Sequence, residues 1–172
     1  RWSRKALSES YFYSNMSPQL GDFNRYKWAE LENWLRAYVE MYGVELYVVT
    51  APVLTENLNK IERSVNGVTV PEYYIKAALD VKNKRAIGFV MPNASLDLPV
   101  EAYSVSIDSV ETLLGYNLFA GLEDSMENRI EASFDYSYWL PNGEKGDVQA
   151  ISPKRLPKNG NNTYGVGVFK ND

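Results

Sequence analysis

The stretch DFNRYKWAELENWLRAYVEMYG (residues 22–43) predicts the main helix of this chain. Its apolar residues recur at spacings of three and four, which is the period of a helix with one buried side. We expect the helix over residues 24–42, with Asp22 as its N-terminal cap and Gly43 as its end. The expected apolar stripe consists of Trp28, Leu31, Leu35, Tyr38, Val39 and Tyr42.

The segments around this helix predict an α+β fold, with an antiparallel sheet flanked by helices. Asn66-Gly67 is a strong hairpin-turn signal, and the apolar run RAIGFVMP is typical of a strand that ends at Pro92. We expect a second short helix opened by Ser106 or Asp108 and closed by Gly115. The expected strands are residues 44–53, 73–80 and 85–92, and the expected further helices are residues 2–9, 108–114 and 123–133.

The composition changes near the end of the chain. Residues 1–140 have the apolar content of a globular domain, whereas residues 141–172 are dense in Gly, Pro and Asn. We therefore assign one domain to residues 1–140 and a tail, or a set of surface loops, to residues 141–172.

The absence of Cys and His excludes several kinds of chemistry within these 172 residues. No disulfide, thiolate metal site, imidazole base or His-ligated zinc can form from them. The net charge of −4 speaks weakly against broad coating of nucleic acid, but residues 1–36 carry +2 and could attract phosphate. No apolar run has the length of a membrane span.

Seven stretches, in this order and spacing, resemble the DNA/RNA non-specific endonucleases of the ββα-metal type. No single stretch is decisive, and the ordered set carries the resemblance. The stretches are RWSRKAL, YFYSNMSPQ, FNRYKWAELENWLR, VVTAPV, VPEYYIKA, FVMPN and IDSVETLLGYNLF. Thr50-Ala51-Pro52 departs mildly from the family's Thr-Gly-Pro. The family's Asp-Arg-Gly-His motif is absent, and its expected place is just before Arg1.

The resemblance implies a ββα-metal finger whose first arm is missing from this chain. That arm would carry the general-base His, either in an upstream segment or in a separate chain, so we expect the 172 residues alone to be inactive. The complete protein would hydrolyse DNA and RNA to 5′-phosphate ends with Mg²⁺, or with Mn²⁺ in its place. The alternative is an inactive relative that binds nucleic acid or a protein partner.

The resemblance also implies roles for particular residues. Asn24 matches the family's metal ligand, although from its position alone it could simply cap the helix. Glu32 matches a glutamate that orders the metal's waters, and it could equally form an i,i+4 ion pair with Arg36, worth ~0.3–0.5 kcal/mol. Arg36 matches an arginine near the site, and alternatively it could only orient Glu32. Asn15 matches a positioning residue, with an Asx turn as the alternative.

Basic and aromatic residues near the site have two interpretations each. The basic residues could contact the nucleic-acid backbone or form ordinary solvated surface; they are Arg1, Arg4, Lys5, Arg25 and Lys27. We expect Trp28 in the core and Trp34 packed against another element rather than stacked on a base.

Three further expectations concern a carboxylate pair, oligomeric state and location. Asp108 and Glu111 could act as a carboxylate pair, but a cap and a first-turn acid are the favoured interpretation. The resemblance leaves homodimer formation open, and it favours a secreted or periplasmic location.

Overall fold

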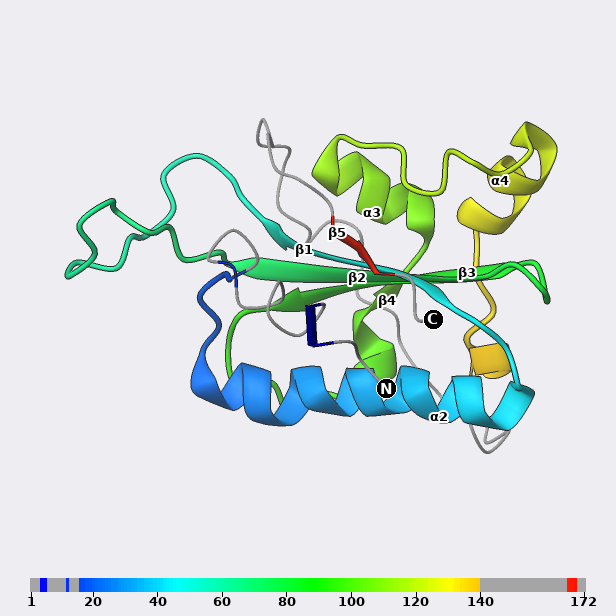
Figure 1. Cartoon of the computed structure of the whole chain (residues 1–172), viewed down its shortest axis with the longest axis horizontal. Helices are drawn as coiled ribbons and strands as arrows, with labels where there is room; N and C mark the ends of the chain where they lie inside the picture. Colours follow the sequence, from blue (N-terminus) through cyan, green and yellow to red (C-terminus); the bar gives the residue numbers. More distant parts are fainter. Residues whose placement is uncertain (1–3, 6–11, 13–15, 140–166, 170–172) are drawn as a thin grey trace.

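A central antiparallel sheet organises the chain (Figure 1). The computed structural model describes residues 4–5, 12, 16–139 and 167–169. Within these residues the strand order is β4-β3-β2-β1-β5, and every neighbouring pair is antiparallel. The strands are β1 (Tyr47–Val53), β2 (Tyr73–Asp80), β3 (Arg85–Pro92), β4 (Ser104–Val105) and β5 (Gly167–Phe169).

Helices cover both faces of this sheet. In Figure 1, α2 lies below the sheet, and α3 and α4 lie above it. The predicted α+β fold with an antiparallel sheet flanked by helices is thus confirmed; the missing first arm of the finger stays a prediction. The helical segments are η2 (Phe23–Trp28), α2 (Ala29–Tyr42), η3 (Val100–Tyr103), α3 (Ile107–Leu114), α4 (Asp124–Glu131) and η4 (Tyr136–Trp139). No helix in the described part is long and apolar enough to cross a membrane.

Strands β2 and β3 are buried on both faces, which places them at the centre of the core. Successive side chains of a strand point to opposite faces. Tyr74 and Ala78 of β2 therefore join the core between the sheet and α2. Ile75, Ala77 and Leu79 join the core between the sheet and α3 and α4. The predicted ranges of both strands, residues 73–80 and 85–92, are confirmed.

Four of the six residues of the predicted apolar stripe are buried against the sheet, whereas Val39 is half-buried and Tyr42, near the end of the helix, is exposed. Trp28, Leu31, Leu35 and Tyr38 are buried, and Gly43 ends the helix in the left-handed conformation at φ 56°. Trp34 packs against aromatic rings of β3 and η4, which confirms packing over base stacking. Its ring contacts are Phe89, Tyr136 and Trp139.

The start of this helix differs from the prediction. Asp22 has helical backbone angles and makes no capping bond, so the predicted cap is wrong. The physical reason is that the backbone N–H of Asn24 already donates to the backbone carbonyl of Leu20 at 2.9 Å, which places Asp22 inside the first turn. The same bond places Asn24 within the helix rather than at its cap. The segment from Phe23 to Trp28 is π-helical, which widens the turn that carries Asn24.

The remaining predicted elements are confirmed in part. Gly67, at φ 64°, makes the expected turn, but only a single Lys60–Thr69 bridge flanks it. Ser106, not Asp108, caps α3 by accepting the Ser109 amide. Of the expected helix at residues 2–9, only Arg4 and Lys5 are described, and both are helical. Strand β5 falls in the segment predicted as tail or loops, and it pairs with β1.

A buried carboxylate joins the end of α2 to the β2–β3 turn. Asp80 is fully buried and accepts hydrogen bonds from the Tyr38 hydroxyl at 2.7 Å and from the Asn83 amide at 2.9 Å. The Asn83 side chain donates to the same carboxylate at 2.7 Å. Burial and this carboxylate raise the pKa of Tyr38 well above its ordinary value, so the hydroxyl stays a donor.

We expect Gly88→Ala to lower the free energy of unfolding by about 1–3 kcal/mol. A Cβ at this position would lie 2.5 Å from Cγ2 of Val110 and 3.2 Å from the Ser106 carbonyl, so α3 would have to move off β3. Urea denaturation measures the change. Gly121→Ala is the matched control, because a Cβ there meets nothing within 4 Å. Equal losses in the two variants would contradict close packing at Gly88.

Candidate active site

The loop before η2 is fixed by side chains from the sheet. The Tyr74 hydroxyl lies 2.8 Å from the Ser17 hydroxyl and donates to the Pro18 carbonyl at 2.9 Å. Asn93, which follows β3, accepts from the Leu20 amide at 2.8 Å and donates to the Pro18 carbonyl at 3.1 Å. Tyr74 of β2 and Asn93 after β3 therefore set where the chain enters the helix.

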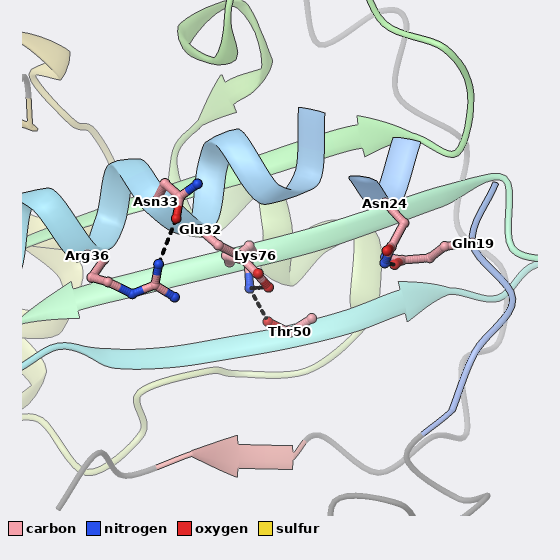
Figure 2. A network of polar contacts seen from close by, with 7 residues as sticks. All are labelled: Gln19, Asn24, Glu32, Asn33, Arg36, Thr50 and Lys76. Carbon is pink, nitrogen blue, oxygen red and sulfur yellow. Dashed lines mark hydrogen bonds and ion pairs between the residues drawn. The ribbon is translucent and has the colours of Figure 1, made fainter. Parts of the chain in front are cut away.

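Asn24 lies on the exposed side of η2, next to this fixed loop. Its side-chain NH₂ donates to Oε1 of Gln19, and Figure 2 shows the two amides facing each other. Because this bond uses the nitrogen of the Asn24 amide, Oδ1 is left without a hydrogen-bond partner among the described residues. A carbonyl oxygen held in this way is a suitable ligand for a hard cation such as Mg²⁺.

Glu32 lies two turns further along and faces the sheet (Figure 2). Its Oε1 is 3.5 Å from Nζ of Lys76 on β2. The side chain of Glu32 keeps 46% of its surface exposed, whereas that of Lys76 keeps only 7%. The ion pair therefore joins a partly exposed carboxylate on the helix to a buried ammonium on the sheet.

Lys76 makes further contacts that compensate for its burial. Its Nζ donates to Oγ1 of Thr50 at 2.8 Å and lies 4.6 Å from the ring centroid of Trp28. Burial lowers the pKa of Lys76, and the Glu32 carboxylate opposes that shift. A buried ammonium is costly unless it is paired and hydrogen-bonded, so these three neighbours together hold the charge in place.

Arg36 does not pair with Glu32, contrary to one of our two interpretations. Its guanidinium donates to Oδ1 of Asn33 at 2.6 Å (Figure 2). The reason is electrostatic, since a buried ammonium gains more from the Glu32 carboxylate than an exposed guanidinium does. Arg36 remains close to Glu32 along the helix without bonding to it.

The other predicted site residues are placed less completely. Asn15 and Arg1 lie outside the described residues. Arg4, Lys5 and Arg25 are exposed. Lys27 forms an i,i+3 ion pair with Glu30 at 2.7 Å, so part of its charge is offset within its own helix.

Sequence reasoning missed Gln19, Thr50 and Lys76 as parts of this site. Lys76 carries the signal that could have revealed it, since it is the single charge inside the apolar run YYIKAAL of a strand buried on both faces. Thr50 follows from the sheet register, because it is the residue paired with Lys76 across β1 and β2. That register is a property of the fold and is not written in either segment alone.

Comparison with known proteins agrees with the family resemblance seen in the sequence. A family profile described as DNA/RNA non-specific endonuclease matches residues 1–125. Mitochondrial endonuclease G of Bos taurus is 30% identical over 128 residues, covering 67% of this chain and 42% of the relative. Nuclease 1, mitochondrial, of Schizosaccharomyces pombe is 28% identical over 140 residues, with 71% and 43% covered. A nuclease of Nostoc sp. is 32% identical over 139 residues, with 73% and 48% covered. The chain thus spans less than half the length of these relatives.

We expect Thr50→Val to lower the free energy of unfolding by about 1–3 kcal/mol, because the Lys76 ammonium loses its hydroxyl acceptor while the side-chain shape is kept. Urea denaturation measures the cost of Thr50→Val in the otherwise unchanged chain and in the Lys76→Met background. In the Lys76→Met background no ammonium is left unpaired, so Thr50→Val should cost less than about 0.5 kcal/mol. Equal costs in the two backgrounds would show that Thr50 does not serve Lys76.

Proposed function

Because the chain belongs to the DNA/RNA non-specific endonuclease family, we propose that the complete protein is a Mg²⁺-dependent endonuclease. It hydrolyses phosphodiester bonds of DNA and RNA with little sequence preference and leaves 5′-phosphate ends. The observation that carries the proposal is the side-chain amide of Asn24. Its nitrogen donates to Gln19, and its oxygen has no hydrogen-bond partner among the described residues. In the proposed nuclease this oxygen must be free to bind the metal ion.

Asn24 Oδ1 is the proposed protein ligand of Mg²⁺, with Mn²⁺ as the substitute ion. Mg²⁺ prefers oxygen ligands and keeps several waters, so one protein ligand suffices. When bound, the ion would neutralise charge on the scissile phosphate and on the leaving 3′ oxygen. The bond from Asn24 to Gln19 sets the direction of Oδ1, and the anchored loop before η2 holds Gln19 in turn.

Glu32 is proposed to order water molecules around the metal rather than to bind it directly. Eight residues of helix rise by about 12 Å, which is too far for Asn24 and Glu32 to share one ion as direct ligands. Lys76 fixes one oxygen of Glu32 by the 3.5 Å contact, which leaves the other oxygen to face solvent. A carboxylate held by a buried cation in this way keeps a fixed orientation.

The remaining roles follow the family resemblance. Asn15 positions the general base or a phosphate oxygen, and Arg36 lies at the edge of the site. Arg1, Arg4, Lys5 and Arg25 contact the nucleic-acid backbone, which binds without reading sequence. Lys27 contributes less than these, because Glu30 already pairs with it.

The general base is proposed to be a His upstream of Arg1, since the 172 residues contain no His. The matched part covers only 42% and 43% of two compared relatives, so each of those proteins contains further residues outside the match, which supports the proposal of an additional segment in the complete protein. A secreted or periplasmic location is proposed, although two of the compared relatives are named mitochondrial. The absence of His also favours a second candidate, an inactive relative that binds nucleic acid or protein.

We expect the 172-residue chain alone to leave supercoiled plasmid uncut in Mg²⁺, and the protein with its preceding segment to cut it. The physical reason is that the 172 residues contain no imidazole, the side chain whose unperturbed pKa lies closest to neutral pH. Agarose-gel assays of nicking over time measure both. Rapid cleavage by the His-free chain would contradict the assigned base, and a complete protein that binds plasmid without cutting it would favour the inactive relative.

We expect Asn24→Ala in the complete protein to reduce the Mg²⁺-dependent cleavage rate by at least 100-fold, as typical for loss of a metal ligand that stabilises the transition state. Initial rates over a Mg²⁺ titration measure the effect. Asn128→Ala is the matched control, because this exposed amide on α4 bonds only within its own helix, to the Asp124 carbonyl. Normal cleavage by Asn24→Ala would show that the metal is held elsewhere.

A further inference from the structure

Helices α3 and α4 bring carboxylates together on the sheet face opposite α2 (Figure 1). Asp108 and Glu111 come from α3, and Glu131 comes from the end of α4. One oxygen of each lies within 4.8 Å of one oxygen of each of the others. Like charges at this separation repel strongly, so the arrangement needs a compensating positive charge or a proton.

The buried member of this group lacks any such partner. Glu131 is 4% exposed, and its Oε1 has no hydrogen-bond partner. Oε1 of Glu127, one turn earlier on α4, is likewise buried and unpartnered. No Lys or Arg in the described part of the chain forms an ion pair with these carboxylates. An unpaired buried carboxylate that faces two further carboxylates points to a cation as the missing partner.

We propose that Asp108, Glu111 and Glu131 form a Ca²⁺ site that joins α3 to α4. Glu111 accepts the Leu118 amide at 2.6 Å through Oε1, which fixes its side chain and leaves its second oxygen for the ion. Asp108 is exposed and so provides the entry path and room for water ligands. Glu131 supplies the buried ligand, and Glu127 adds negative charge beside it.

The ligand set favours Ca²⁺ over the other common ions. Ca²⁺ accepts six to eight oxygen ligands in flexible geometry, as carboxylates from two separate helices provide. Mg²⁺ requires a tight octahedron and keeps more of its water, which suits the single ligand Asn24 better than this cluster. Zinc prefers nitrogen and sulfur ligands, and the chain has no His or Cys.

A proton is the competitor for this site. Burial, together with the smaller effects of the charges on Glu111, Glu127 and Asp108, raises the pKa of Glu131 to about 7. The only charged side chain of β3, the other element packed on α4, is Arg85, which lies over the Tyr138 ring at 3.9 Å instead. Between about pH 4.5 and 7, Glu131 in the folded state thus holds a proton that it has lost in the unfolded chain.

This sets the sign of the pH dependence. Without Ca²⁺, the contribution of Glu131 to stability falls as pH rises from about 4.5, the ordinary glutamate value, to about 7, and it levels off above. Ca²⁺ binds only the ionised carboxylates, so the stabilisation it provides grows across the same window and is complete above it.

The test is thermal unfolding of the protein at pH 8 and pH 5, in EDTA and in CaCl₂. At pH 8 and 100 times the dissociation constant, Ca²⁺ should raise Tm by about 5–10 °C. At pH 5 the rise should largely disappear. Glu131→Gln should abolish the Ca²⁺ response, whereas Asn24→Ala, which alters the proposed catalytic metal ligand, and the surface control Glu45→Gln should keep it. Loss of the response in Asn24→Ala alone would overturn the proposal.

Two further outcomes would overturn it. One is a protein that gains stability at acid pH but shows no Ca²⁺ response at pH 8, which would make Glu131 a proton site only. The other is a full Ca²⁺ response in Glu131→Gln. Should Glu131→Gln fail to fold, Asp108→Asn replaces it, because Asp108 is exposed and outside the core. Calorimetric titration with CaCl₂ should then show at least a tenfold weaker site in Asp108→Asn.

Discussion

The two-sided burial of β2 and β3 is the constraint on which the rest of the structure depends. A strand buried on both faces must be covered by helices from above and from below. The amphipathic main helix covers one face, and α3 and α4 cover the other (Figure 1). This arrangement fixes the distance of η2 and α2 from the sheet, so the side chains that leave the helix toward β1 and β2 reach defined positions.

Lys76 shows how this constraint positions the side chains of the candidate site. An ammonium inside a strand of this kind cannot reach bulk water, so it must find its partners within the fold. The register of β1 against β2 provides Thr50, and the helical segments η2 and α2 provide Trp28 and Glu32. Glu32 consequently turns toward the sheet instead of toward Arg36, its neighbour one turn away. The orientation of this exposed carboxylate is therefore decided by a buried residue on another element.

The sequence predicts those parts of the fold that local patterns determine. The limits of β2 and β3 follow from apolar runs between turn residues, and Gly43 ends its helix because it adopts φ 56°. The helix start could not be predicted, since the hydrogen bond from the backbone N–H of Asn24 to the Leu20 carbonyl depends on a loop held by Tyr74 and Asn93. Strand β5 could not be predicted either. Its pairing with β1 holds it in the sheet, whereas the sequence around it is rich in Gly.

The site shows the same division. Asn24 and Glu32 stand in one helix, and resemblance to a family can single them out together. Their supports come from Gln19, Thr50 and Lys76, which lie on a loop and two strands, and only the folded chain brings them there. The net charge of −4 is misleading for a related reason. Part of that charge gathers at α3 and α4, on the face opposite the Asn24 helix, where a bound divalent cation would offset it. An acidic total therefore says little about the charge that a nucleic acid meets on the α2 side.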